Sequence, residues 1–136
     1  MSRRWPVAAV LLGRLIFAAV FAMAVSFKLM DVGATASFIA SAGFPVAHLL
    51  AWAAIVLEIL LVIGLLTGAG FSAACLVAAA YVLFLAFAFH GPSHWAANPS
   101  EFGFFVDHFT FTAGLLFGAA HGPGDTLVWK PGRRGA

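Results

Sequence analysis

The chain has 136 residues, of which 63% are hydrophobic and only 9% are charged, and its mean hydropathy is +1.04. Soluble domains carry about 25% charged residues, so this composition excludes an ordinary water-soluble fold and indicates a small protein with several membrane spans. The net charge is +2, and most basic residues lie near the two ends, a distribution typical of membrane topology rather than of nucleic-acid binding.

The hydropathy pattern predicts an all-α integral membrane protein: one domain over residues 1–136, built as a bundle of four transmembrane helices. The predicted spans are residues 7–27, 47–66, 71–89 and 102–120. Glycine and proline follow or separate these runs, as expected at helix ends. We interpret the first run as a retained span rather than a signal peptide, because Arg14 interrupts its apolar stretch.

The distribution of basic residues predicts the orientation. An even number of spans puts both termini on one side, and that side carries five lysines and arginines, whereas the opposite loops carry only Lys28. The positive-inside rule then predicts that both termini are cytoplasmic. Within the first outer loop, residues 34–42 are expected to form a short helix at the membrane surface.

Two opposite charges are predicted at similar depth inside the membrane. Glu58 lies in an 18-residue run, Leu49–Leu66, that has no other charge, and Arg14 interrupts the first span. A charge at the centre of a span costs about 2.5–3.5 kcal/mol, so a partner is expected. At about 1.5 Å per residue the two lie within a few ångströms of one level, which predicts an Arg14–Glu58 ion pair. Such a pair could serve a ligand or only fix helix packing.

Asp107 and His108 form a second polar site in the fourth span. A buried carboxylate beside a titratable histidine is a reasonable proton-relay element. The alternative is an Asp107–Lys28 salt bridge with His108 hydrogen-bonded across helices. A metal or haem between His90 and His108 is a third possibility, but the histidines lack the spacing of a metal site on one helix face, and no metal is expected.

Several segments in order resemble one family. The first span contains Gly13-Arg14-Leu15-Ile16-Phe17 and then Ser26-Phe27-Lys28-Leu29. The following loop contains Ala40-Ser41-Ala42-Gly43-Phe44-Pro45. The second span contains Leu57-Glu58-Ile59-Leu60-Leu61-Val62-Ile63-Gly64-Leu65-Leu66-Thr67, and the closing turn is His121-Gly122-Pro123-Gly124. Over residues 10–125 the sequence resembles the DoxX family.

The resemblance implies a four-helix protein of the bacterial inner membrane that is associated with redox chemistry. One branch of the family is a subunit of thiosulfate:quinone oxidoreductase. Arg14, Lys28 and Glu58 match charged positions that recur in the family. Where the family often has a Lys-Asn pair, this chain has Asp107-His108, and this charge reversal argues against carrying over a site for anionic thiosulfate.

These observations predict a membrane subunit of a quinone-linked redox complex, which binds quinone or passes a partner's electrons to it. The cofactor expected is a non-covalently bound quinone. The expected partners are membrane lipid, a co-encoded oxidoreductase subunit and further copies of the chain, so a complete enzyme in one chain is not expected. The candidate residues are Glu58, Asp107 and His108 for catalysis and Arg14, Lys28, Phe21 and Trp52 for quinone binding.

Two other functions remain open. The chain could be a non-catalytic anchor or assembly subunit whose intramembrane charges only fix helix packing. It could also be a transporter of small molecules or protons, which at this length would require an oligomer to build a pathway.

Overall fold

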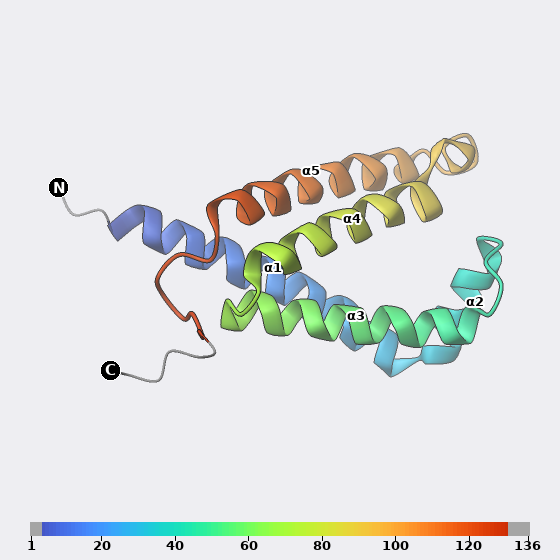
Figure 1. The fold of residues 1–136 in the computed structure, drawn as a ribbon. Coiled ribbons are helices and arrows are strands. Elements are labelled where there is room, and N and C mark those ends of the chain that lie inside the picture. Colours follow the sequence, from blue (N-terminus) through green and yellow to red (C-terminus); the bar gives the residue numbers. More distant parts are fainter. Residues whose placement is uncertain (1–3, 131–136) are drawn as a thin grey trace. The chain divides into compact units, whose positions relative to one another are not determined.

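The computed structural model describes residues 4–130, and all regular structure in this part is helical (Figure 1). The elements are α1 (Arg4–Met30), α2 (Val32–Ser41), α3 (Ala47–Thr67), α4 (Phe71–His90), the 3-10 helix η1 (Pro92–His94) and α5 (Ser100–His121). Four of these helices are long and apolar enough to cross a membrane. The prediction of an all-α membrane protein with four spanning helices is confirmed.

Helix α1 is longer than the predicted span at both ends. Its 27 residues measure about 40 Å, which exceeds the roughly 30 Å of a bilayer's hydrocarbon core, so its ends reach the polar layers. It ends next to Asp31, whose side chain accepts a hydrogen bond from the Ala34 amide at 2.8 Å and caps α2. The short helix that the sequence predicts after the first span is therefore present, two residues earlier than expected.

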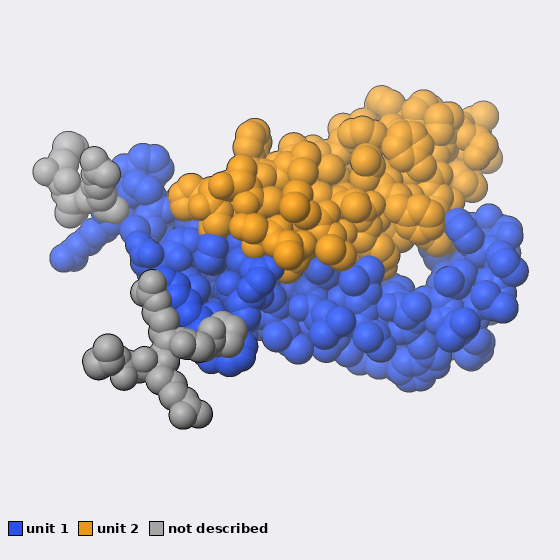
Figure 2. All heavy atoms as spheres, in the orientation of Figure 1, with its two compact units in different colours: residues 1–71, 123–136 blue, residues 72–122 orange. Residues whose placement is uncertain are grey.

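The chain divides into two compact units (Figure 2): residues 1–71 with 123–136, and residues 72–122. In the first unit, α1 and α2 both pack against α3. Alanines among its buried side chains let the helices approach closely. The buried apolar residues of α1 and α3 are Ala18, Phe21, Val25, Ala51, Ile55, Leu61 and Leu65. In the second unit, α4 and α5 are joined through η1, and their aromatic side chains meet.

Val46, immediately before α3, has a strained backbone. Its φ of 50° and ψ of 41° are left-handed, a conformation that costs a residue with a side chain roughly 1–2 kcal/mol relative to glycine. Val46→Gly should therefore raise the free energy of unfolding by about 1 kcal/mol. Denaturant unfolding in detergent measures this, and Val32→Gly within α2 should lower stability in the same assay. A Val46→Gly protein less stable than wild type would contradict the expectation.

Candidate functional site

Glu58 forms an ion pair with Lys28 between α3 and α1. The Lys28 Nζ atom lies 2.9 Å from Glu58 Oε1 and 3.1 Å from Oε2. The carboxylate is almost completely buried, with 2% of the side chain exposed, whereas the Lys28 side chain is 24% exposed. The structure thus brings together two predicted site residues, and the charge in the middle of α3 is neutralised by a cation near the C-terminal end of α1.

The buried Arg14 side chain binds backbone carbonyls with all five of its N–H groups. Nε and one N–H of Nη2 donate to carbonyls in the last turn of α3. Both N–H groups of Nη1 and the second N–H of Nη2 donate to carbonyls of the segment after α5. The accepting carbonyls belong to Leu65, Leu66, Pro123, Thr126 and Leu127, at 2.6–3.1 Å. The guanidinium also lies 5.5 Å from the Phe71 ring centroid. Arg14 therefore holds the C-terminal segment against α3.

The prediction that Arg14 pairs with Glu58 is wrong. Arg14 contacts α3 at Leu65 and Leu66, which lie about 10 Å along the helix from Glu58. Helical side chains lean toward the N-terminus of their own helix. On α1 this directs Arg14 toward the C-terminal end of α3. It directs Lys28 back along α1, toward the middle of that helix. Glu58, on the antiparallel α3, leans toward Lys28, so the two meet.

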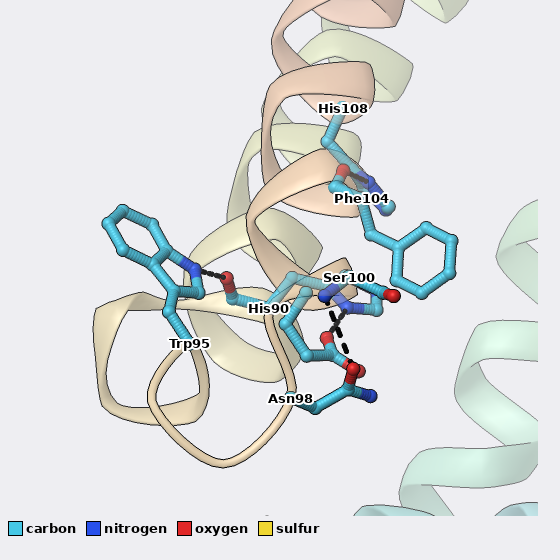
Figure 3. A network of polar contacts seen from close by, with 7 residues as sticks. His90, Trp95, Asn98, Ser100, Phe104 and His108 are labelled. Atoms are coloured by element: carbon cyan, nitrogen blue, oxygen red, sulfur yellow. Dashed lines mark hydrogen bonds and ion pairs between the residues drawn. The ribbon is translucent and has the colours of Figure 1, made fainter.

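A second polar group lies where α4 ends and α5 begins (Figure 3). The His90 Nδ1 atom is 2.5 Å from Glu101 Oε2, and the His90 and His108 ring centroids are 4.9 Å apart. His108 Nδ1 is 2.7 Å from the Phe104 carbonyl oxygen. Because a carbonyl can only accept, Nδ1 of His108 is the donor in this contact, and Nε2 points away from it. We call His90, Glu101 and His108 the histidine cluster.

The connection between α4 and α5 fixes the histidine cluster. The Trp95 indole donates to the His90 carbonyl at 2.9 Å, which satisfies one of the free carbonyls at the end of α4 (Figure 3). The Asn98 side chain accepts from the Ser100 amide at 3.2 Å, which satisfies one of the free amides at the start of α5. Glu101 follows in the first turn of α5, where the helix dipole favours a negative charge.

Aromatic rings surround the histidine cluster. His90 packs 5.5 Å from the Phe104 ring, and His108 packs 6.3 Å from the Phe111 ring. The first contact is tilted and the second is edge-to-face, and such contacts favour fixed ring orientations. The other ring pairs are Phe87–Phe105, Phe87–Phe109, Trp95–Phe102, Trp95–Phe105 and Phe105–Phe109, at 4.9–5.9 Å. The cluster is therefore a polar group set in a largely aromatic surface.

Asp107 lies outside the histidine cluster. Its side chain is exposed, so the expectation of a buried carboxylate is wrong, and its neighbour His108 points to His90 instead. One residue along a helix turns the side chain by about 100°, which separates the two faces. Lys28, the partner of Asp107 in the alternative interpretation, is paired with Glu58.

The two predicted aromatic contacts to quinone differ in burial. Phe21 is buried, two helical turns before Lys28 on the same face of α1, so it belongs to the core of the first unit. Trp52 on α3 is about half exposed. Its indole is free to contact lipid or a ligand, and tryptophan is common near the membrane surface.

Glu101 and Trp95 were not predicted as functional residues, and His90 was considered only as a possible metal or haem ligand. The sequence does contain a signal: His90 closes one span and Glu101 opens the next, so a short hairpin must bring them together. His90 and His108 are neighbours, as the metal interpretation required. However, residues 4–130 contain no group of three or more His, Cys, Asp or Glu side chains that could hold a metal ion.

The fold defines a helical membrane protein with four spanning helices, stabilised in its first unit by buried charges. The DoxX family profile matches residues 9–91, and the chain belongs to the DoxX family. The match includes Arg14, Lys28, Glu58 and His90 and ends before α5. No curated protein and no solved structure matches the chain.

Proposed function

We propose that this DoxX protein is the membrane subunit of a quinone-linked redox complex and that it binds the quinone headgroup at the histidine cluster. The observation that carries the proposal is the close approach of two tilted imidazoles, whose ring centroids are 4.9 Å apart, with one of them bound to a carboxylate, within an aromatic surface. Hydrogen-bonding groups on an aromatic wall suit a flat ring with two carbonyl oxygens.

The histidine cluster contains groups that can exchange the protons that quinone reduction requires. Reduction to the quinol adds two electrons and two protons, and histidine is the side chain best suited to exchange protons near neutral pH. The electrons are assigned to a partner oxidoreductase subunit, because neither imidazole nor carboxylate carries them. The aromatic residues would contact the ring faces, and the imidazole Nε2 atoms would contact its oxygens.

The proposal places the chain in a bacterial inner membrane with both termini in the cytoplasm. The distribution of lysine and arginine along the sequence supports this orientation. The histidine cluster, at the end of α4, would then lie toward the outer side, and the quinone would exchange its protons with the outer aqueous phase. A cysteine introduced for Ser93, in the loop beside the cluster, should react with impermeant maleimide added outside spheroplasts. Labelling that occurs only after lysis would show that this loop faces the cytoplasm and would contradict the proposed orientation.

The first unit favours the role of a scaffold. Lys28 and Glu58 neutralise each other, and Arg14 binds backbone carbonyls, so these charges have structural partners. This observation supports the non-catalytic anchor as the second candidate function. The anchor would be favoured if histidine-cluster variants left quinone binding unchanged. Substrate uptake by liposomes that contain only this protein would instead support transport.

The quinone proposal predicts a specific pattern of variant affinities. His90→Gln and His108→Gln should each weaken binding of a short-chain quinone by about tenfold, because one good hydrogen bond contributes about 1.4 kcal/mol. Equilibrium dialysis of the purified full-length protein in detergent measures the affinity. His94→Gln, a matched change at an exposed histidine of η1, should bind as wild type. Equal affinity for all four proteins would contradict the proposal.

A further inference from the structure

We propose that the C-terminal segment, residues 123–130, binds the headgroup of an anionic phospholipid and anchors the first unit at the membrane surface. This segment follows α5 and has neither helix nor strand. It belongs to the first unit, where it lies against the end of α3. No residue of the histidine cluster takes part, so the inference is independent of the proposed quinone site.

Hydrogen bonds fix the backbone of the C-terminal segment across the end of α3. Arg14 donates to three of its carbonyls at 2.6–3.1 Å, and the Trp129 amide donates to the Thr67 carbonyl at 2.7 Å. Thr67 is the last residue of α3, whose 21 residues measure about 30 Å, the thickness of the hydrocarbon core of a bilayer. The segment therefore lies at the depth of the lipid headgroups.

The segment turns one apolar side chain inward and leaves two on the surface. Val128 packs so closely on Gly68 that a Cβ atom added to this glycine would lie 3.3 Å from the valine. Leu127 and Trp129, on either side of Val128, are each 63% exposed. Tryptophan is enriched where headgroups meet acyl chains, because its ring is apolar and its N–H can donate to a headgroup. The two exposed side chains thus suit contact with lipid.

The backbone of Leu127 is strained. Its φ of 52° is left-handed, a conformation that leucine rarely adopts and that persists only where surrounding contacts fix it. The fixing contact is the hydrogen bond from Arg14 Nη2 to the Leu127 carbonyl, at 2.8 Å. Although the backbone is held in this way, the leucine side chain stays on the surface. Contact with lipid would remove this side chain from water, which is favourable.

The charge of this part of the chain selects an anionic lipid. Lys130 comes directly after Trp129, Arg133 and Arg134 follow in the sequence, and Asp125 is the only acidic residue after α5. Within residues 4–130, Lys130 has no ion-pair partner. A lysine at the membrane surface can extend its ammonium group to a headgroup phosphate, and basic residues near a span attract anionic lipids.

A second copy of the chain suits this surface less well. Contact between two copies around a twofold axis would place the same basic segment opposite itself. Like charges that face each other across an interface are unfavourable. An anionic headgroup neutralises the segment instead, and its acyl chains cover the exposed apolar side chains.

Quenching of tryptophan fluorescence by brominated phospholipids tests the proposal. The full-length protein with Trp5, Trp52 and Trp95 replaced by phenylalanine keeps Trp129 as its one tryptophan. It is reconstituted in vesicles of phosphatidylcholine and phosphatidylglycerol, with bromine on the acyl chains of one lipid or of the other. At equal mole fraction, brominated phosphatidylglycerol should quench more strongly. Lys130→Gln should reduce this preference about fivefold, because one lysine near an anionic surface contributes about 1 kcal/mol.

Arg4→Gln is the matched control, because it removes an exposed charge about 15 Å along α1 from Arg14, beyond the Debye length of about 10 Å at 0.1 M salt. It should leave the preference unchanged. Arg14→Met should abolish the preference by releasing the segment, but it also lowers stability, so Lys130→Gln decides the test.

Three results would overturn the proposal. Equal quenching by the two brominated lipids would show that the segment does not select an anionic headgroup. Quenching by neither lipid would show that Trp129 is covered by water or by a second copy of the chain. Loss of the preference on adding inorganic phosphate, but not chloride at the same ionic strength, would assign the site to a soluble phosphate.

Discussion

Replacing Arg14 with methionine should lower the free energy of unfolding by about 3 kcal/mol, one of the two largest effects that the structure predicts. Methionine fills part of the same volume but donates no hydrogen bond, so five carbonyls lose their common donor. Each hydrogen bond to a charged group contributes about 1.5–3 kcal/mol, but the carbonyls after α5 can be rehydrated, which limits the sum. The C-terminal segment should also become accessible to protease.

Denaturant unfolding in detergent, with proteolysis of residues 123–130 followed by mass spectrometry, measures both effects. Arg14→Lys retains the charge but has three donors on one nitrogen, so it should recover less than half of the lost stability. Arg4→Gln changes an exposed arginine of the same helix and should have no effect. Wild-type stability and protease resistance in Arg14→Met would show that the guanidinium does not hold the segment.

Breaking the Lys28–Glu58 pair should have the second large effect on stability. The loss should differ between the variant that removes the lysine and the variant that removes the carboxylate. Lys28→Met should cost about 3–5 kcal/mol, because it leaves the carboxylate of Glu58 buried without its cation. Glu58→Gln should cost less, since the partly exposed Lys28 ammonium can turn toward water or headgroups. Thermal unfolding of the two single variants in detergent gives the order directly.

The double variant Lys28→Met/Glu58→Leu provides the control. Replacing a buried ion pair by apolar side chains is often nearly neutral, so much of the stability lost in Lys28→Met should return. With the single variant Glu58→Leu measured as well, the double-mutant cycle should show a coupling free energy of about 1–3 kcal/mol. Additive losses, or a larger loss for Glu58→Gln than for Lys28→Met, would contradict the pairing of these two residues.

The spans and the short α2 helix could be predicted because composition and length decide them. Eighteen or more apolar residues have few stable forms other than a spanning helix. The partner of Glu58 could not be obtained in the same way. Depth along the helix axis locates a Cα atom, whereas Lys28 and Arg14 have long side chains that lean away from their own depth toward the helix N-terminus.

Only part of the histidine cluster could be predicted from the sequence. His108 was a candidate because it lies inside a span, but the companion proposed for it was the adjacent Asp107. Adjacent residues on a helix face different ways, whereas residues on either side of a hairpin meet. The contact between His90 and Glu101 depends on the conformation of the connecting loop, which Trp95 fixes by bonding to a backbone carbonyl. Helical periodicity carries no information about such a contact.

The family match covers only part of the histidine cluster. It covers His90 but stops before α5, which contributes Glu101 and His108. The Lys28–Glu58 pair and Arg14 lie within the matched region. The proposed quinone site would then combine a helix inside the matched region with a helix outside it.

Photolabelling with an azido-quinone tests the proposed site most directly. The full-length protein in detergent is irradiated with the probe, digested, and the labelled residues are identified by mass spectrometry, with excess unlabelled quinone as the competitor. We expect competitor-sensitive label on residues 87–111, and we expect His108→Gln to reduce it. Label confined to α1 and α3 around the Lys28–Glu58 pair, or label that excess quinone does not displace, would contradict a quinone site at the histidine cluster.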